Sequence, residues 1–130
     1  MIMASKILLR LQFLVRVVRK ECKHLSTTDQ RRFGRLQDTV GDKLLPLLLT
    51  ALGEKQSAAI DNLDRGERLG LIHSTDEWMI LRNLRNQMVH EYIEDPVVLS
   101  SALQTGHTFV PTLITAADNM IAEITRRGWA

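Results

Sequence analysis

The chain has 130 residues, with 17 lysines and arginines against 15 aspartates and glutamates, and 45% of it is hydrophobic. This length fits one domain with a genuine core, and the hydrophobic content excludes a disordered chain. The formal charge of +2 permits nucleic-acid binding without arguing for it, because the charges are mixed along the chain. The single cysteine, Cys22, excludes an intrachain disulfide and is compatible with a reducing compartment, so we expect a cytoplasmic protein.

The first predicted element is an amphipathic helix over about residues 5–23. Apolar residues recur there three and four apart, which is the helical period: Ile7, Leu8, Leu11, Leu14, Val15 and Val18. Basic residues interrupt every apolar run: Lys6, Arg10, Arg16 and Arg19. A secretory signal needs about 7–15 uninterrupted apolar residues and a membrane span about 20. We therefore expect a core helix, and no membrane partner.

Residues 26–29 predict a break and an N-cap, followed by a second helix over about residues 29–52. Pro46 should kink this helix, because proline lacks the backbone donor and clashes one turn back, and Gly53 closes it. Its apolar face contains Phe33, Leu36, Val40, Leu44, Leu47 and Leu48. A polar stripe on the same helix carries Arg31, Arg35, Asp38 and Asp42, for which solvated surface ion pairs are the ordinary interpretation.

Three further segments are predicted to be helical. The first covers about residues 57–71, with Ile60, Leu63 and Leu69 facing inward. A capping box that starts at Ser74 begins the next helix, which extends to about residue 93. Asp95 and Pro96 begin the last helix, over about residues 97–127, which we expect to be interrupted near Gly106 or kinked at Pro111. No strand pattern alternates, so the expected fold is all-α, a single-domain bundle of about five helices over residues 1–130.

The helix that follows Ser74 carries the most informative residues. At about 100° per residue, Arg85 falls in the middle of its apolar stripe, which contains Trp78, Leu81, Leu84, Met88, Val89 and Tyr92. A guanidinium buried without partners is costly, so Arg85 requires an acidic partner, a subunit interface or a substrate phosphate. The candidate acidic partners are Asp38 and Asp42. A polar arc of Asn83, Asn86 and His90 runs beside the stripe.

The pattern Arg85-Asn86-x-x-x-His90-x-Tyr92 resembles the R-N-x-x-x-H-x-Y signature of HEPN-domain toxins, the helical partners of small MNT-type nucleotidyltransferases. The resemblance implies a HEPN-like fold and a metal-independent endoribonuclease without a cofactor, whose active site forms across a homodimer. It implies that Arg85 and His90 are the catalytic pair. It also implies that Tyr92 is the residue that a nucleotidyltransferase antitoxin adenylylates to silence the toxin.

The residue types suit RNA cleavage without a metal. His90 can transfer protons because an imidazole titrates near pH ~6.5, and the planar fork of Arg85 can bind two phosphate oxygens. Residues five apart on an ideal helix point about 140° apart, so one subunit does not readily place both on one face. A symmetric dimer eases this geometry, because each residue can face the same cleft from a different chain. Asn86, four residues before His90, can orient the imidazole ring.

Two alternatives remain open at this point. In one, Arg85 pairs with a core carboxylate, His90 caps the helix or bonds a carbonyl, and Tyr92 is a half-buried core residue. In the other, the chain is a non-catalytic subunit that binds the substrate or nucleotide of a nucleotidyltransferase. No metal site is expected, since Cys22 and His24 lack the second ligand pair that zinc requires. The basic residues of the first helix are interpreted as a solvated face, with an electrostatic track for RNA as the alternative: Arg10, Arg16, Arg19, Lys20 and Lys23.

Overall fold

The computed structural model describes residues 5–25, 30–55, 57–90 and 95–130, and all regular secondary structure within them is helical. The long second helix contains a π-helical segment, η1, between two α-helical parts. Counted with that helix as one, the described residues form five helices: α1 (Ser5–Lys23), α2–η1–α3 (Gln30–Asp38, Thr39–Leu44 and Leu45–Ala51), α4 (Ala59–Arg68), α5 (Thr75–His90) and α6 (Pro96–Arg126). The prediction of an all-α fold with about five helices is confirmed.

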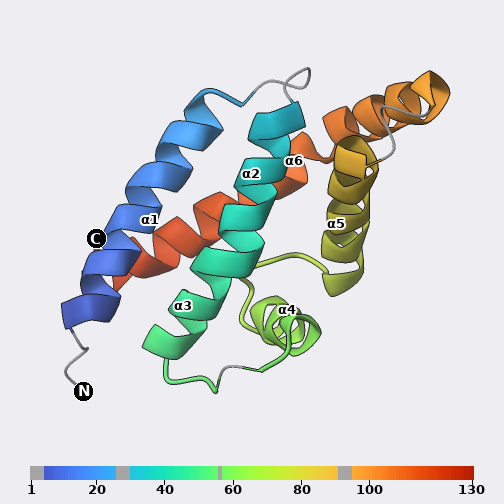
Figure 1. Cartoon of the computed structure of the whole chain (residues 1–130). Helices are drawn as coiled ribbons and strands as arrows, with labels where there is room; N and C mark the ends of the chain where they lie inside the picture. The colour runs from blue at the N-terminus through green and yellow to red at the C-terminus, as the bar shows by residue number, and fades with distance from the viewer. Residues whose placement is uncertain (1–4, 26–29, 56, 91–94) are drawn as a thin grey trace.

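The longest helix, α6, packs against α1, against α5 and against all three parts of the second helix. Figure 1 shows α1 and the α2–η1–α3 helix side by side, with α6 crossing behind both. α5 packs against α2 and α6, and the short α4 contacts both α3, beside which it lies in Figure 1, and α5, below which it lies. The core forms where these helices meet. Its fully buried side chains include Leu11, Val15 and Val18 of α1, Leu36, Val40, Leu44 and Leu48 of the second helix, and Leu113, Met120 and Ile124 of α6. The core faces predicted for the first two helices are therefore confirmed in their central residues.

The disturbance expected at Pro46 takes the form of the π-helical turn η1, which precedes it. The Leu45 amide donates to the Val40 carbonyl, five residues back, as a π-helix requires. A proline removes one backbone donor and its ring presses on the carbonyl one turn back, so a wider turn relieves the crowding. This turn also brings Gly41 against Trp78 of α5, so close that a Cβ at Gly41 would lie 2.5 Å from the indole nitrogen.

The core contribution of α4 differs from the prediction. Ile60 and Leu69 were expected to face inward, but their side chains are 52% and 46% exposed. The helix ends at Arg68, and Gly70 turns the chain through a positive φ of 75°. Leu71 and Ile72 then fill the core, and both their amides donate to the Gly66 carbonyl. The turn at Gly70 replaces the last predicted helical residues and so accounts for the exposure of Leu69, whereas nothing in the structure explains the exposure of Ile60.

The starts of α5 and α6 follow their predicted caps. The Ser74 hydroxyl accepts from the Glu77 amide at 3.2 Å, and the Asp95 carboxylate accepts from the Val97 amide at 2.9 Å. The Glu77 carboxylate lies 3.0 Å from the His73 imidazole.

α6 continues through Gly106 and Pro111 from residue 96 to residue 126, so the predicted interruption near Gly106 is wrong. Figure 1 shows α6 changing direction between its orange and red parts. A proline inside a helix causes such a bend because it removes one hydrogen bond without ending the helix.

Candidate functional site

Arg85 lies at the contact between α5 and α2. Its neighbours on α5, Leu81 and Leu84, are buried, whereas Arg85 itself is half-buried. The arginine stem crosses α2 at Gly34, where a Cβ would be 3.3 Å from Cγ and 3.7 Å from Nε of Arg85. The glycine therefore gives the stem room to lie flat against α2. This contact explains how a charged residue occupies an apolar stripe: its methylene groups are packed while its head reaches the edge of the interface.

The two candidate acidic partners lie near this edge. Asp42, in η1, pairs with Arg82 of α5 at 3.9 Å, and the two side chains are 38% and 34% exposed. Burial raises the pKa of Asp42, and a hydrogen bond to the Asp38 carboxyl raises it further. The positive charges of Arg82 and Arg85 act in the opposite direction on that pKa. Two carboxyls and two guanidinium groups thus share one small region between α2, η1 and α5.

The guanidinium of Arg85 has no carboxylate in direct contact among the residues that the structure describes. Its electrostatic interaction is with Asp42, and the ion pair that Asp42 forms is with Arg82 instead. The stem of Arg85 contacts α2 at Gly34, and no hydrogen bond joins its guanidinium to another of the described residues. A planar guanidinium in this state can accept a phosphate through two parallel hydrogen bonds.

The other residues of the motif are placed less completely. His90 is the last residue of α5, and its side chain lies outside the described part of the structure, as do those of Met88 and Val89. Tyr92 lies within residues 91–94, which the structure does not describe. Asn86 is exposed on α5, one helical turn before His90. The roles assigned to His90, Asn86 and Tyr92 therefore stay predictions.

Sequence reasoning missed two residues of this site. Arg82 lies three residues before Arg85, a spacing that places both near one side of a helix, and this signal was available. Gly34 was also missed, although a glycine inside a helical pattern often marks the close approach of another group. Which group approaches depends on how α5 packs against α2, and no local pattern gives that.

Within the described residues, no group of three or more His, Cys, Asp or Glu side chains could hold a metal ion. None of the helices described here is both long and apolar enough to cross a membrane. Comparisons of the chain with protein-family models, with curated proteins and with solved structures found no match.

Proposed function

We propose that this protein is a metal-independent endoribonuclease of the HEPN toxin type, acting as a homodimer. The observation that carries the proposal is the state of Arg85. Its stem is packed on α2 at Gly34, while its guanidinium has no carboxylate in direct contact among the described residues. A positioned cation of this kind is what the charged phosphorane of RNA cleavage requires. The pattern Arg85-Asn86-x-x-x-His90-x-Tyr92 supplies the proton-transfer group on the same helix.

In the proposed reaction, the ribose 2′-oxygen attacks the adjacent phosphorus and the bond from phosphorus to the 5′-oxygen breaks. One histidine accepts the 2′-hydroxyl proton, and a second, protonated histidine donates to the leaving 5′-oxygen. The products are a 2′,3′-cyclic phosphate and a free 5′-hydroxyl. Because each chain supplies one His90, the two subunits together provide the base and the acid.

Arg82 and Asn86 are positioning residues in this proposal. Arg82 pairs with Asp42 at 3.9 Å, which leaves Arg85 to bind the phosphate. Asn86, four residues before His90 on the same helix, orients the imidazole ring. Arg82→Ala should therefore lower cleavage by allowing Asp42 to turn toward Arg85, and Arg82→Lys should restore part of it. A purely structural role for Arg82 would instead change stability without this rescue.

The test is cleavage of RNA by the purified chain in EDTA, with the 3′ ends analysed for 2′,3′-cyclic phosphate. Arg85→Ala should lower the rate by about 10²–10³, and His90→Ala should abolish cleavage. Arg68→Ala, which removes an exposed cation from the end of α4, is the matched control and should cleave normally. Circular dichroism and light scattering establish folding and dimerisation for each variant. Undiminished cleavage by His90→Ala contradicts the mechanism, and a loss of folding in Arg85→Ala favours a structural role for that residue.

We further propose that an MNT-type nucleotidyltransferase silences this enzyme by attaching AMP to Tyr92. Tyr92 lies seven residues after Arg85, or two helical turns if α5 were extended to it. An AMP phosphate there competes with RNA phosphate for the guanidinium. Tyr92→Phe should then cleave RNA normally and escape silencing. Mass spectrometry of the co-expressed pair checks this, and an unmodified Tyr92 peptide from a silenced sample contradicts it.

The same assays separate this proposal from a non-catalytic subunit that binds a nucleotide or acceptor for a nucleotidyltransferase. Such a subunit binds phosphate through Arg85 without breaking a bond. It would bind RNA or nucleotide, yield no cyclic phosphate, and leave growth unaffected when it is expressed alone. The endoribonuclease should arrest growth, and His90→Ala should remove the arrest.

A further inference from the structure

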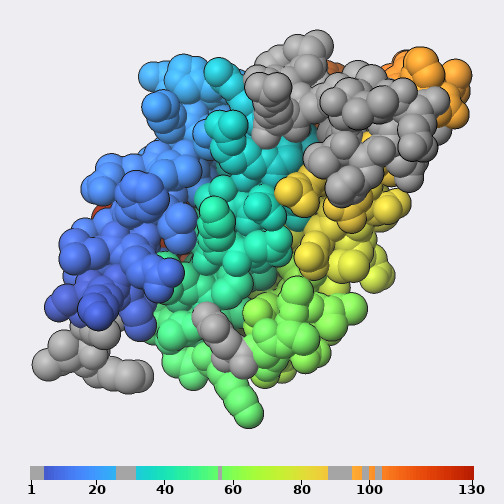
Figure 2. Space-filling view, viewed as in Figure 1, coloured from blue at the N-terminus to red at the C-terminus, as the bar shows by residue number. Residues whose placement is uncertain are grey.

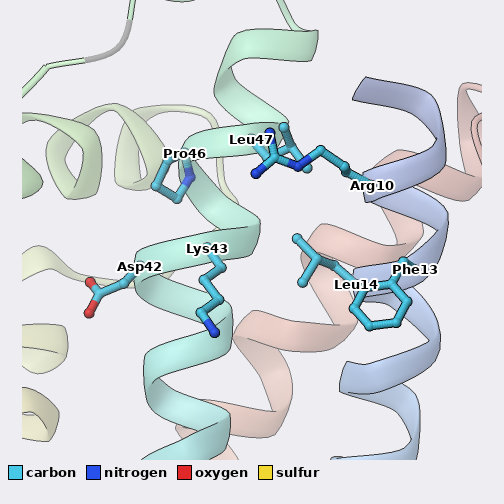
Figure 3. A pocket seen from close by; sticks show the side chains of 7 residues that line it. All are labelled: Arg10, Phe13, Leu14, Asp42, Lys43, Pro46 and Leu47. Carbon is cyan, nitrogen blue, oxygen red and sulfur yellow. The ribbon is translucent and has the colours of Figure 1, made fainter. Parts of the chain in front are cut away.

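A groove runs between α1 and the middle of the second helix, on the side of that helix away from α5. Figure 3 shows its walls: Arg10, Phe13 and Leu14 come from α1, and Lys43, Pro46 and Leu47 come from η1 and α3. The volume is about 530 Å³, within the range of about 300–1,000 Å³ usual for ligand sites. We call this the α1/η1 groove.

The groove combines three kinds of side chain in one place. Leu14, Pro46 and Leu47 are half-buried and form an apolar lining, while Arg10 and Lys43 are exposed cations, one on each wall. Phe13 is 57% exposed, so most of its ring is accessible to solvent. Asp42 also borders the groove, but Figure 3 shows its carboxylate directed away from Arg10 and Lys43. The two cations therefore determine the charge inside.

Further basic residues continue along the same two helices. A second hollow, of about 220 Å³, lies between α1 and α2 and is lined by Lys20, Glu21, His24, Arg32 and Arg35. Its carboxylate, Glu21, lies 3.5 Å from Arg35. Figure 2 shows that α1 and the second helix adjoin along one face of the molecule. A polyanion lying along this face meets cations at both hollows and an accessible aromatic ring in one of them.

We propose that the α1/η1 groove binds single-stranded RNA, with Arg10 and Lys43 on successive phosphates and the Phe13 ring stacked on a base. This inference rests on the proposed function, because it assigns a binding surface to the RNA that the endoribonuclease would cleave. Single-stranded nucleic acid is bound in this way, by a basic groove combined with aromatic side chains. Duplex RNA does not fit, because its bases are stacked inside and are not accessible to Phe13. Asp42 links the groove to the candidate site, since it borders one and pairs with Arg82 in the other.

The experiment measures the binding of a fluorescein-labelled 2′-O-methyl oligouridylate by fluorescence anisotropy in EDTA, at several salt concentrations. The 2′-O-methyl groups prevent cleavage, so binding is measured independently of the proposed reaction. Arg10→Ala and Lys43→Ala should each lower the slope of log affinity against log salt by about 0.7. Arg68→Ala, at the end of α4, should leave both affinity and slope unchanged. All these side chains are exposed, so folding is retained.

Substitutions of Phe13 distinguish base stacking from apolar contact as the source of its contribution to RNA binding. Phe13→Ala and Phe13→Leu should both weaken binding about five- to a hundredfold without changing the salt slope, because leucine keeps the apolar bulk but has no π-face. Wild-type RNA affinity in Phe13→Leu overturns the proposal, because the ring would then contribute no stacking on a base. A dimer dissociation constant that changes with Phe13→Ala, while RNA affinity does not, likewise overturns it and assigns this face to a second copy of the chain.

Cleavage assays on the same variants distinguish this inference from the proposed function. If the wild-type chain cleaves RNA but Arg10→Ala and Lys43→Ala bind like Arg68→Ala, the inference fails and the endoribonuclease proposal stands. If RNA binding depends on the groove and no cleavage occurs, the inference stands for a binding protein and the endoribonuclease proposal fails. If the oligonucleotide does not bind at any salt concentration, the inference is overturned.

Discussion

Replacing Gly41 by alanine should destabilise the fold, although alanine is the better helix former. The added Cβ would lie 2.5 Å from the Trp78 indole nitrogen and 2.9 Å from two ring carbons. Real Cβ atoms essentially never approach another group closer than 3.0 Å. Trp78 is 1% exposed and its ring is rigid, so it has no free space into which to move. Either the ring shifts into the core or η1 separates from α5.

Two opposing free energies determine the size of the effect. Ordinary van der Waals contact begins at 3.4 Å, so the ring and the helix must separate by about 0.9 Å, the difference between 3.4 and 2.5 Å. Overpacking of this kind typically costs about 1–3 kcal/mol, and the better helix propensity of alanine offsets about 1 kcal/mol. Because the approach of 2.5 Å is well inside the 3.0 Å limit, we take the upper half of the overpacking cost, about 2–3 kcal/mol, and expect the free energy of unfolding to fall by about 1–2 kcal/mol. For a domain of this size, that lowers the Tm by about 4–8 °C.

Thermal and urea unfolding followed by circular dichroism measure this effect, with Gly34→Ala as the matched control. Gly34 is a buried glycine in the same long helix, but its Cβ would meet the flexible stem of Arg85 at 3.3 Å, so stability should be unchanged or slightly higher. Trp78→Leu in both backgrounds should reveal a favourable coupling with Gly41→Ala of about 1 kcal/mol or more. If Gly41→Ala is as stable as Gly34→Ala, the contact between η1 and α5 is refuted.

Gly34→Ala should displace the Arg85 side chain by a few tenths of an ångström and lower the rate of RNA cleavage severalfold, while the free energy of unfolding stays unchanged. A wild-type rate of cleavage in this variant would contradict the positioning of Arg85 by α2. Burial raises the pKa of Cys22 from 9.0 to about 11. Near neutral pH, the fraction of Cys22 present as thiolate should therefore be about a hundredfold lower in the native protein than in the unfolded chain. The native protein should react with a disulfide reagent more slowly by the same factor. Burial also raises the pKa of Asp42, so the folded state binds this proton more tightly than the unfolded chain. Stability should therefore fall as the pH rises from the ordinary carboxyl range through the folded pKa, and Asp42→Asn should flatten this part of the profile; an unchanged profile contradicts it.

Local signals in the sequence predicted most of the helices. The extent of α1, Ser5–Lys23, follows from apolar residues that recur three and four apart along the segment. The starts of α5 and α6 follow from Ser74 and Asp95, whose side chains accept the amide hydrogen bonds that their positions predict. α4 was predicted less well, because the turn at Gly70 brings Leu71 and Ile72 into the core in place of Leu69.

Only those features of the candidate site that lie on a single helix could be predicted from the sequence. The charge of Arg85 within an apolar stripe indicated a special environment, and the structure places that residue half-buried at a helix contact. The residues that contact Arg85 depend on the register between α5 and α2, and the spacing of residues along one helix does not predict that register. The spacing of Arg82 and the glycine at position 34 were visible in the sequence, but the contact of Gly34 with the arginine stem and the pairing of Arg82 with Asp42 emerge only from the packed structure.

The π-helical turn η1 connects the two proposed parts of the RNA-binding surface. Asp42 and Lys43 are consecutive in this turn, yet Asp42 pairs with Arg82 of α5 while Lys43 lines the groove with α1. π-helical turns occur frequently at functional sites, where they change the direction of side chains without ending the helix. Consecutive residues of a helix point about 100° apart, so the negative charge of Asp42 is held by α5 and the positive charge of Lys43 remains on the groove. An RNA strand on Lys43 reaches Arg85 by crossing the second helix and following it back nine residues to Gly34, about 13 Å along its axis.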